Sequence, residues 1–239
     1  MRAMLRFGKD GVMRWISHLD TIRTFEKAFR RADLALSTSA GFNPRPKMSS
    51  AVPLALGLRS RGEYLDIELQ NEANPDDLVV KLGNVLPLGM QVLSAAKIPY
   101  SAPPLMALTQ LSLFELTLNP DSGRTWEDAC QRIIQYPKLL INRVDSKGNS
   151  KEIDIRQGIV KLRVDENKQG VCLQATIETS SRFYLRLGEL VDVITTEADV
   201  QNCRLMDLNP IRIDLGVREI DRFCSLSDYF ILASRLYPI

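Results

Sequence analysis

The sequence predicts an α+β protein made of tandem ferredoxin-like domains, each a β-α-β-β-α-β unit with an antiparallel sheet, the second copy divergent. Two segments of the first hundred residues have helical apolar spacing, and strand-like runs flank both of them. A weaker version of the same order follows in the second half. Residues 97–108 contain three prolines and no periodic pattern, which is typical of a linker. We therefore expect a basic first domain at 1–98 and a second α+β domain at 109–239.

The first domain is predicted to open with a hairpin and a long helix. Residues 1–7 and 12–16 are typical of short strands around a glycine-containing turn, the second being an addition to the basic plan. Ser17 can cap a helix over 18–33. Its apolar face is predicted to contain Leu19, Ile22, Phe25, Ala28, Phe29 and Ala32.

The rest of the first domain is predicted to supply three strands and a second helix. Residues 34–39 follow the first helix as a strand, and 63–69 alternate apolar and polar residues as a half-buried strand does. Asn74 and Pro75 form a helix start, and Pro87 ends that helix. Residues 90–95 are predicted to form the closing strand.

The second domain gives a less regular pattern. Helices are predicted to begin near Thr125 and Leu187, and the tail after Arg222 has no clear pattern. The alternation changes phase near Gly158, which indicates a bulge or a break there. The predicted strands cover 111–118, 139–144, 153–164, 171–178 and 211–215.

The composition argues against a membrane protein and against a metalloprotein. No apolar run approaches the roughly 18–20 residues that span a bilayer, and charges interrupt any signal-like start. We therefore expect a cytoplasmic protein with no membrane partner. Four cysteines at wide spacing and a single histidine do not form a metal or cluster motif, so no metal and no cofactor are predicted.

The charge of the chain is unevenly distributed. Of the 31 basic and 29 acidic residues, 12 and 4 lie in the first 61 positions. A net charge of +2 therefore divides into +8 for this segment and −6 for the remainder. A concentrated cationic region attracts phosphate polyanions, so the sequence favours a nucleic-acid partner.

Part of this positive charge is predicted to lie on one face of the first helix. Arg23, Lys27, Arg30 and Arg31 occupy an arc of about 100°, nearly opposite the apolar face. An ordinary solvated face is the alternative, although such faces usually mix charges of both signs.

The segment after the helix combines cations with a stiff backbone. Alternating prolines restrict the geometry around Arg45 and Lys47, and Phe42 and Asn43 come just before them. Phe42 could stack on a base, Asn43 could bind a base edge, and the two cations could bind phosphates. The alternative is a rigid crossover loop with Phe42 buried. Further along, Arg59 and Arg61 lie between Gly57 and Gly62, which favours close approach of an anion.

His18 is the one weak catalytic candidate. At the positive end of a helix its imidazole would stay neutral and could act as a general base in RNA cleavage. A polar residue packing at a helix start is the alternative. Ser17, His18 and Asp20 are too close in sequence for triad geometry. An enzyme is therefore not the leading prediction.

Four motifs carry a resemblance to a known family. They are Trp15-Ile16-Ser17-His18-Leu19-Asp20, Gly41-Phe42-Asn43-Pro44-Arg45-Pro46-Lys47, Pro53-Leu54-Ala55-Leu56-Gly57 and Gly62-Glu63-Tyr64-Leu65-Asp66, with an echo at Glu152-Ile153-Asp154-Ile155-Arg156. In these the chain resembles the radical SAM-linked protein family, a bacterial family of unknown function. The resemblance implies a radical SAM protein as partner, found beside such chains or fused ahead of them, so this chain could be a detached C-terminal region. It implies no catalytic residues, and the chain lacks the cysteine triplet of a radical SAM enzyme.

The leading prediction is an accessory module that binds tRNA or rRNA for a radical SAM enzyme. Two alternatives remain open. One is an RNA-processing or RNA-modifying enzyme that uses His18, and the other is a protein-docking module whose basic patch contacts an acidic surface of the radical SAM partner.

Overall fold

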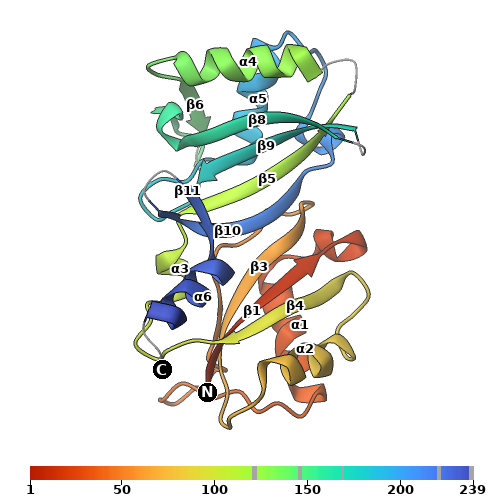
Figure 1. The fold of residues 1–239 in the computed structure, drawn as a ribbon, viewed down its shortest axis with the longest axis vertical. Helices are drawn as coiled ribbons and strands as arrows, with labels where there is room; N and C mark the ends of the chain where they lie inside the picture. Colours follow the sequence, from red (N-terminus) through yellow and green to blue (C-terminus); the bar gives the residue numbers. More distant parts are fainter. Residues whose placement is uncertain (120–122, 145–146, 168–169, 220–221, 237–239) are drawn as a thin grey trace. The chain divides into compact units, whose positions relative to one another are not determined.

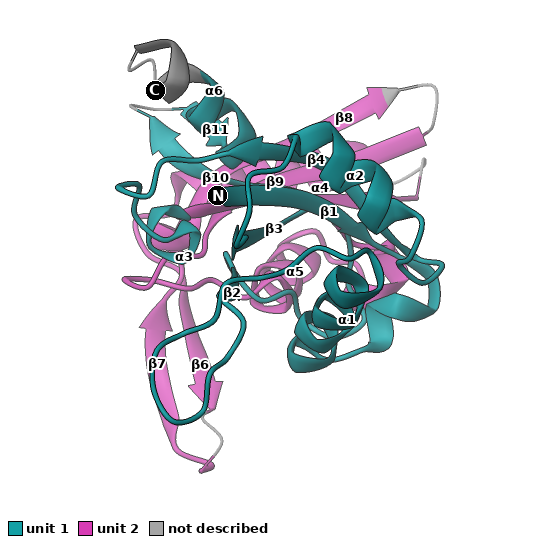
Figure 2. Ribbon diagram, turned by 90° about the horizontal axis from the view of Figure 1, so that it is seen from below, with its two compact units in different colours: residues 1–109, 212–239 teal, residues 110–211 magenta. Residues whose placement is uncertain are grey.

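The structure is a computed structural model that describes residues 1–119, 123–144, 147–167, 170–219 and 222–236. It is an α+β protein with mostly antiparallel sheet, as the sequence predicts (Figure 1). The chain divides into two compact units, which are coloured separately in Figure 2. Unit 1 contains residues 1–109 and 212–239, and unit 2 contains residues 110–211.

Unit 1 is built on four antiparallel strands in the order β4-β1-β3-β2, with β10 also beside β3 and β11 paired to β10. Two helices connect the four strands in the sequence β1-α1-β2-β3-α2-β4, which is the order expected of one β-α-β-β-α-β domain. The elements are β1 (Arg2–Lys9), η1 (Gly11–Trp15), α1 (His18–Arg31), β2 (Met48–Ser50), β3 (Arg59–Glu68), α2 (Pro75–Gly83), β4 (Met90–Lys97), α3 (Leu105–Leu108), β10 (Ile211–Glu219), β11 (Arg222–Ser225) and α6 (Leu226–Leu236).

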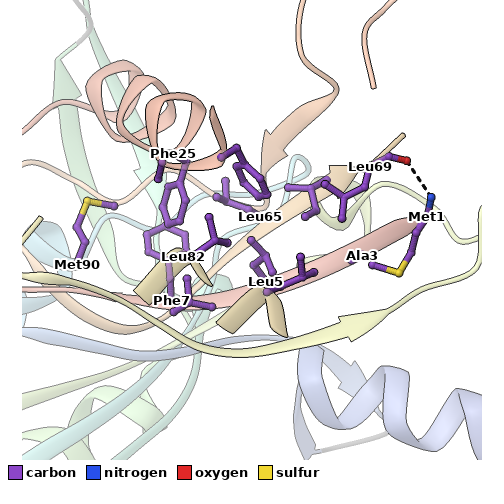
Figure 3. Packing of buried hydrophobic residues seen from close by; sticks show 14 residues of the cluster. Met1, Ala3, Leu5, Phe7, Phe25, Leu65, Leu69, Leu82 and Met90 are labelled. Carbon is purple, nitrogen blue, oxygen red and sulfur yellow. Dashed lines mark hydrogen bonds between the residues drawn. The ribbon is translucent and has the colours of Figure 1, made fainter. Parts of the chain in front are cut away.

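Helices α1 and α2 pack on one face of this sheet (Figure 3). The rings of Phe7 on β1 and Phe25 on α1 meet edge to face, with centroids 4.8 Å apart. Leu82 of α2 joins the same cluster. The opposite face buries Tyr64 against a second cluster that includes Phe230 of α6. Apolar side chains on both faces explain why the predicted simple alternation of β3 is only partly observed.

Four local predictions for unit 1 are wrong or incomplete. Residues 12–16 are not a strand, because residues 11–15 form the 3-10 helix η1. Asp10 accepts a hydrogen bond from the Gly11 N–H and starts a turn there. Residues 34–39 form only isolated bridges, so β2 takes the place of the predicted strand. Leu19 is exposed in the first turn of α1, whereas the buried residues of the helix begin at Thr21. The expected linker 97–108 packs within unit 1, where Leu105 is fully buried.

Unit 2 has a three-stranded antiparallel sheet in the order β5-β9-β8 and a separate β6-β7 hairpin. The strand predicted over 153–164 is interrupted by a 3-10 turn, η3, so the phase change at Gly158 marks a true break. The elements are β5 (Leu111–Leu118), α4 (Gly123–Gln135), β6 (Leu140–Val144), β7 (Ser150–Asp154), η3 (Arg156–Gly158), β8 (Ile159–Asn167), β9 (Gly170–Glu178), α5 (Leu187–Glu197) and η4 (Leu205–Leu208).

The end of the chain belongs to unit 1, whereas the sequence predicts a second domain that continues to residue 239. Polar contacts account for this. Arg212 on β10 pairs with Glu63 on β3, and the Tyr64 hydroxyl donates to Asp214 at 2.6 Å. Buried charged groups require such partners, which fixes β10 beside β3.

In the described part of the chain, every helix is too short or too polar to cross a bilayer.

Candidate functional site

Helix α1 determines where the predicted basic face lies. Ser17 caps the helix by accepting a hydrogen bond from the Asp20 N–H at 3.1 Å. The buried side chains of Phe25 and Phe29 fix the rotation of the helix against the sheet. The opposite side of the helix is therefore exposed, and it carries Arg23, Lys27, Arg30 and Arg31.

The segment after α1 folds back on itself as a braced loop. The Ser39 N–H donates to the Arg45 carbonyl at 2.8 Å, and the Lys47 N–H donates to the Ser37 carbonyl at 2.7 Å. The Ser39 hydroxyl also accepts from the Arg45 N–H at 3.0 Å. These bonds, together with the prolines, hold the loop without a regular strand.

The tip of this loop is open to solvent. Phe42 is fully exposed, so the alternative in which its ring is buried is wrong. Asn43, Arg45 and Lys47 are exposed as well. An exposed aromatic ring in a braced loop is free to stack on a flat ligand.

A groove joins the end of α1 to this loop. It has a volume of about 310 Å³, and Arg30 and Pro46 both line it over an apolar floor that includes Phe29. Glu26 and Asp33 lie at the same groove. The structure therefore brings the end of the basic helix to the base of the proline loop.

The cations of the helix and loop differ in whether a carboxylate already binds them. Arg23 pairs with Asp20 at 3.2 Å, and Lys47 pairs with Glu68 at 3.0 Å. The other four have no ion pair and no side-chain hydrogen bond within the described residues; they are Lys27, Arg30, Arg31 and Arg45.

Arg59 and Arg61 are not gathered with this group. Arg59 donates two hydrogen bonds to the Asp10 carboxylate, at 2.9 and 2.8 Å, and these bonds hold the pKa of Asp10 below its usual range. Arg61, on β3, lines a different groove, together with residues of β1, α2 and β4. Gly62 serves packing: a Cβ there would lie 2.4 Å from the carbonyl oxygen of Ile213. Gly62 is therefore needed for the close packing of β3 against β10, and its presence does not indicate an anion site.

His18 lines a second cavity, which is much smaller than the groove at α1. With Lys9 and Glu63 it lines a cavity of about 10 Å³, roughly the space of one water molecule. Burial lowers the pKa of His18, and the nearby Lys9 ammonium lowers it further. The imidazole is therefore neutral near neutral pH, which either a general base or a packed helix-start residue would be.

The sequence gives no signal for the buried charges around His18. Lys9 is buried, donates to the Ile16 carbonyl at 2.9 Å, and has its pKa lowered by burial. Arg212 Nη1 lies 3.0 Å from both carboxylate oxygens of Glu63, and these side chains are only 1% and 4% exposed. Glu63 interacts with the charges of both Lys9 and Arg212, which are far from it in the chain, Arg212 by 149 positions, so no local pattern connects the three.

Within the described residues, a metal or thiol site would need a particular arrangement of side chains. No group of three or more His, Cys, Asp or Glu side chains is placed to hold a metal ion there. All four cysteines are free thiols. Burial raises the pKa of Cys130 to about 12, which makes that thiol inert.

Comparison with known proteins identifies the family of the chain. Residues 2–187 match the family described as "Uncharacterized protein conserved in bacteria (DUF2344)", and the chain belongs to that family. The predicted membership of a bacterial family of unknown function is therefore confirmed. No curated protein matches the chain.

The likeness to solved structures is distant. The chain is similar, at 11% identity and a TM-score of 0.40, to a chain in the "Crystal Structure of a Cbf5-Nop10-Gar1 Complex". The match covers 99% of this chain and 56% of that chain, so this chain spans just over half of its length. A TM-score of 0.40 is too low to carry an argument about function.

Proposed function

We propose that unit 1 binds unpaired segments of tRNA or rRNA through a basic surface formed by α1 and the loop after it. This basic surface consists of Arg23, Lys27, Arg30, Arg31, Phe42, Asn43, Arg45 and Lys47. The observation that carries the proposal is the set of four exposed cations that no carboxylate in the described chain neutralises. Arg59 and Arg61, which the sequence suggested as a rim, are left out because they lie elsewhere.

These four cations are suited to phosphate binding because they have no carboxylate partner within the described chain. A cation that already has a carboxylate partner must give up that ion pair before it binds a phosphate. No ion pair has to be broken at the other four, which are Lys27, Arg30, Arg31 and Arg45. Each phosphate that they neutralise releases condensed counterions, so binding should weaken steeply as salt is added.

The loop tip supports contacts to bases. Stacking of a base on an exposed ring stabilises single-strand binding by about 1–3 kcal/mol. Bases inside a duplex do not present their faces, so Phe42 favours loops, bulges and ends over paired RNA. Asn43, next to it, can donate to and accept from a base edge.

The wider role rests on the family resemblance. We infer that the chain presents RNA to a radical SAM protein in the cytoplasm and that it is an accessory protein. We also infer that unit 2 is a divergent copy of the first fold. The order β5-α4-β8-β9-α5 supports this, with the β6-β7 hairpin as an insertion.

A matched pair of lysine substitutions tests RNA binding. Lys27 on α1 and Lys81 on α2 are both exposed helical lysines of unit 1. Fluorescence anisotropy with a labelled tRNA anticodon stem-loop should show weaker binding for Lys27→Gln and unchanged binding for Lys81→Gln. Equal losses in the two variants would indicate a general charge effect, and no binding by the wild type at low salt would reject the proposal.

The second candidate function is RNA cleavage with His18 as general base. His18 is the first residue of the basic helix α1, and its neutral imidazole can accept a proton, as this role requires. This candidate predicts turnover of RNA by the isolated chain, and His18→Ala should abolish it. Binding without turnover would leave the accessory role as the better account.

A further inference from the structure

The groove between the end of α1 and the loop after it contains charges that phosphate binding does not explain. Glu26 and Asp33 line it together with Arg30. Within the described residues, these two carboxylates have no ion pair and no side-chain hydrogen bond. A carboxylate repels phosphate, so both acids oppose general binding of an RNA backbone. They favour an RNA ligand only where it offers hydrogen-bond donors, which are its bases and its 2′-hydroxyls.

The end of α1 accounts for one of the two acids. Asp33 has a φ of +55°, and its N–H donates to the Arg30 carbonyl at 3.4 Å. The Leu34 N–H donates to the Phe29 carbonyl at 3.0 Å. This pair of bonds is the Schellman motif, and Asp tolerates its left-handed residue better than most side chains do. Asp33 therefore has a reason in the fold, whereas Glu26, within the regular helix, does not.

The facing wall of the groove is held by the main chain as well. The Gln70 N–H donates to the Ala35 carbonyl at 2.9 Å. Thr38 and Pro46 form a β-bridge on the loop. Both walls therefore keep their positions without a ligand, and a site that is already formed loses less conformational entropy when it binds.

The size and floor of the groove suit a single nucleotide. Its volume of about 310 Å³ lies at the small end of ligand sites. Phe29, Leu34 and Leu36 provide an apolar floor, on which a flat ring can lie. Arg30 is exposed at the same groove and can bind the phosphate of that nucleotide. The ring edge is then left to the half-buried carboxylate of Glu26.

Guanine is the base that suits a carboxylate best. Its N1–H and its N2 amino group are neighbouring donors, and both oxygens of one carboxylate can accept from them. Adenine and cytosine place a ring nitrogen acceptor beside their amino group, and that acceptor would face the carboxylate. Uracil has a single N–H between two carbonyl groups. The 2′-hydroxyl is present on every nucleotide and gives no preference among them.

We propose that this groove binds an unpaired guanine of the RNA, with Glu26 accepting hydrogen bonds from N1–H and the N2 amino group. This inference rests on the proposed RNA binding and adds base selectivity to it. Glu26 is then a specificity-determining residue: it stabilises guanine and repels the acceptors of the other bases.

Four single-stranded RNAs test the guanine site. One is an oligouridylate of nine nucleotides, and the others have guanosine, adenosine or cytidine at its centre. Fluorescence anisotropy with the full chain should show the guanosine RNA binding at least about fivefold tighter than the other three, which corresponds to about 1 kcal/mol. Inosine at the same position lacks the N2 amino group and should bind more weakly than guanosine.

Glu26→Gln keeps the length of the side chain and replaces one of its two acceptors by a donor. It should bring the affinity for the guanosine RNA down to that of the other three. Glu127→Gln is the matched control, since Glu127 is an exposed glutamate of α4 without an ion pair in the described chain. This control should keep the full preference for guanosine.

The outcomes separate the guanine site from RNA binding itself. Equal binding of all four RNAs, tightest binding of a base other than guanine, or an unchanged preference in Glu26→Gln would overturn the guanine site and leave RNA binding in place. No binding by any of the four would reject RNA binding, and the guanine site with it.

Discussion

Unit 1 contains two groups of cationic side chains, one paired with carboxylates at a strand contact and one exposed to solvent. Arg212 and Arg6 lie at the β3–β10 contact, where Glu63 and Asp214 bind them. Lys27, Arg30 and Arg31 lie on α1, exposed and without ion pairs in the described chain. The first group holds strands together, whereas the second contributes nothing visible to the fold. Charge that the fold does not use is the charge available to a ligand.

Breaking the buried Glu63–Arg212 ion pair should lower the stability of unit 1 more than any other change proposed for it. Glu63→Ala leaves the Arg212 guanidinium buried without its carboxylate, which should cost about 3–5 kcal/mol of unfolding free energy. Glu68→Ala breaks the exposed Lys47 pair and should cost less than about 1 kcal/mol. Urea unfolding followed by circular dichroism measures both. Equal costs would mean that burial does not distinguish the two groups.

The close approach of β10 to β3 gives the second prediction. Gly62→Ala would place a Cβ 2.4 Å from the Ile213 carbonyl oxygen, so the strands must shift. Overpacking of this kind costs about 1–3 kcal/mol. Gly83→Ala is the control, since a Cβ there meets nothing within 4 Å and Ala favours a helix by about 1 kcal/mol. A thermal melt should move down for Gly62→Ala and slightly up for Gly83→Ala.

Phe42→Ala separates binding from folding. Because the ring is fully exposed, its removal should leave the unfolding free energy unchanged. Affinity for an unpaired RNA loop should fall by about 1–3 kcal/mol, while affinity for a fully paired duplex should not change. Anisotropy with the two RNAs makes the comparison. A loss of stability would instead assign the ring to packing.

Protonation of His18 should change the free energy of unfolding least. Its pKa should lie below the usual value of about 6.5. As pH falls, the unfolded chain then takes up the proton before the native chain does, so His18 contributes a loss of stability below about pH 6.5. The single imidazole can be followed directly by NMR, and Lys9→Met should raise its pKa. A value above 6.5 would contradict the burial described here.

The sequence predicts the elements that depend on local pattern, and it misses those that depend on distant partners. The bounds of α1 and α2 follow from Ser17, Asn74 and apolar spacing, and both are close to the prediction. Residues 12–16 look like a strand because their apolar content does not reveal the Asp10 cap that starts a turn. The break at Gly158 was visible as a phase change because it is a local event.

In the candidate site, too, the sequence predicts what depends on local pattern and misses what depends on distant partners. Exposure of the α1 cations follows from helical periodicity alone. Helical periodicity does not predict which carboxylate binds which cation. Asp10 binds Arg59, 49 positions away, and Glu63 binds Arg212, 149 positions away. The pairing with Asp10 removes Arg59 from the basic surface that the sequence predicts.

The salt dependence of RNA affinity measures how many of these cations bind phosphates. If the four unpaired cations each neutralise one phosphate, log affinity for a single-stranded RNA should fall against log salt with a slope of about −3. Replacing Lys27, Arg30, Arg31 and Arg45 by Gln should bring the slope close to zero while the fold is retained. A wild-type slope near zero, or one that the fourfold variant leaves unchanged, would contradict the account.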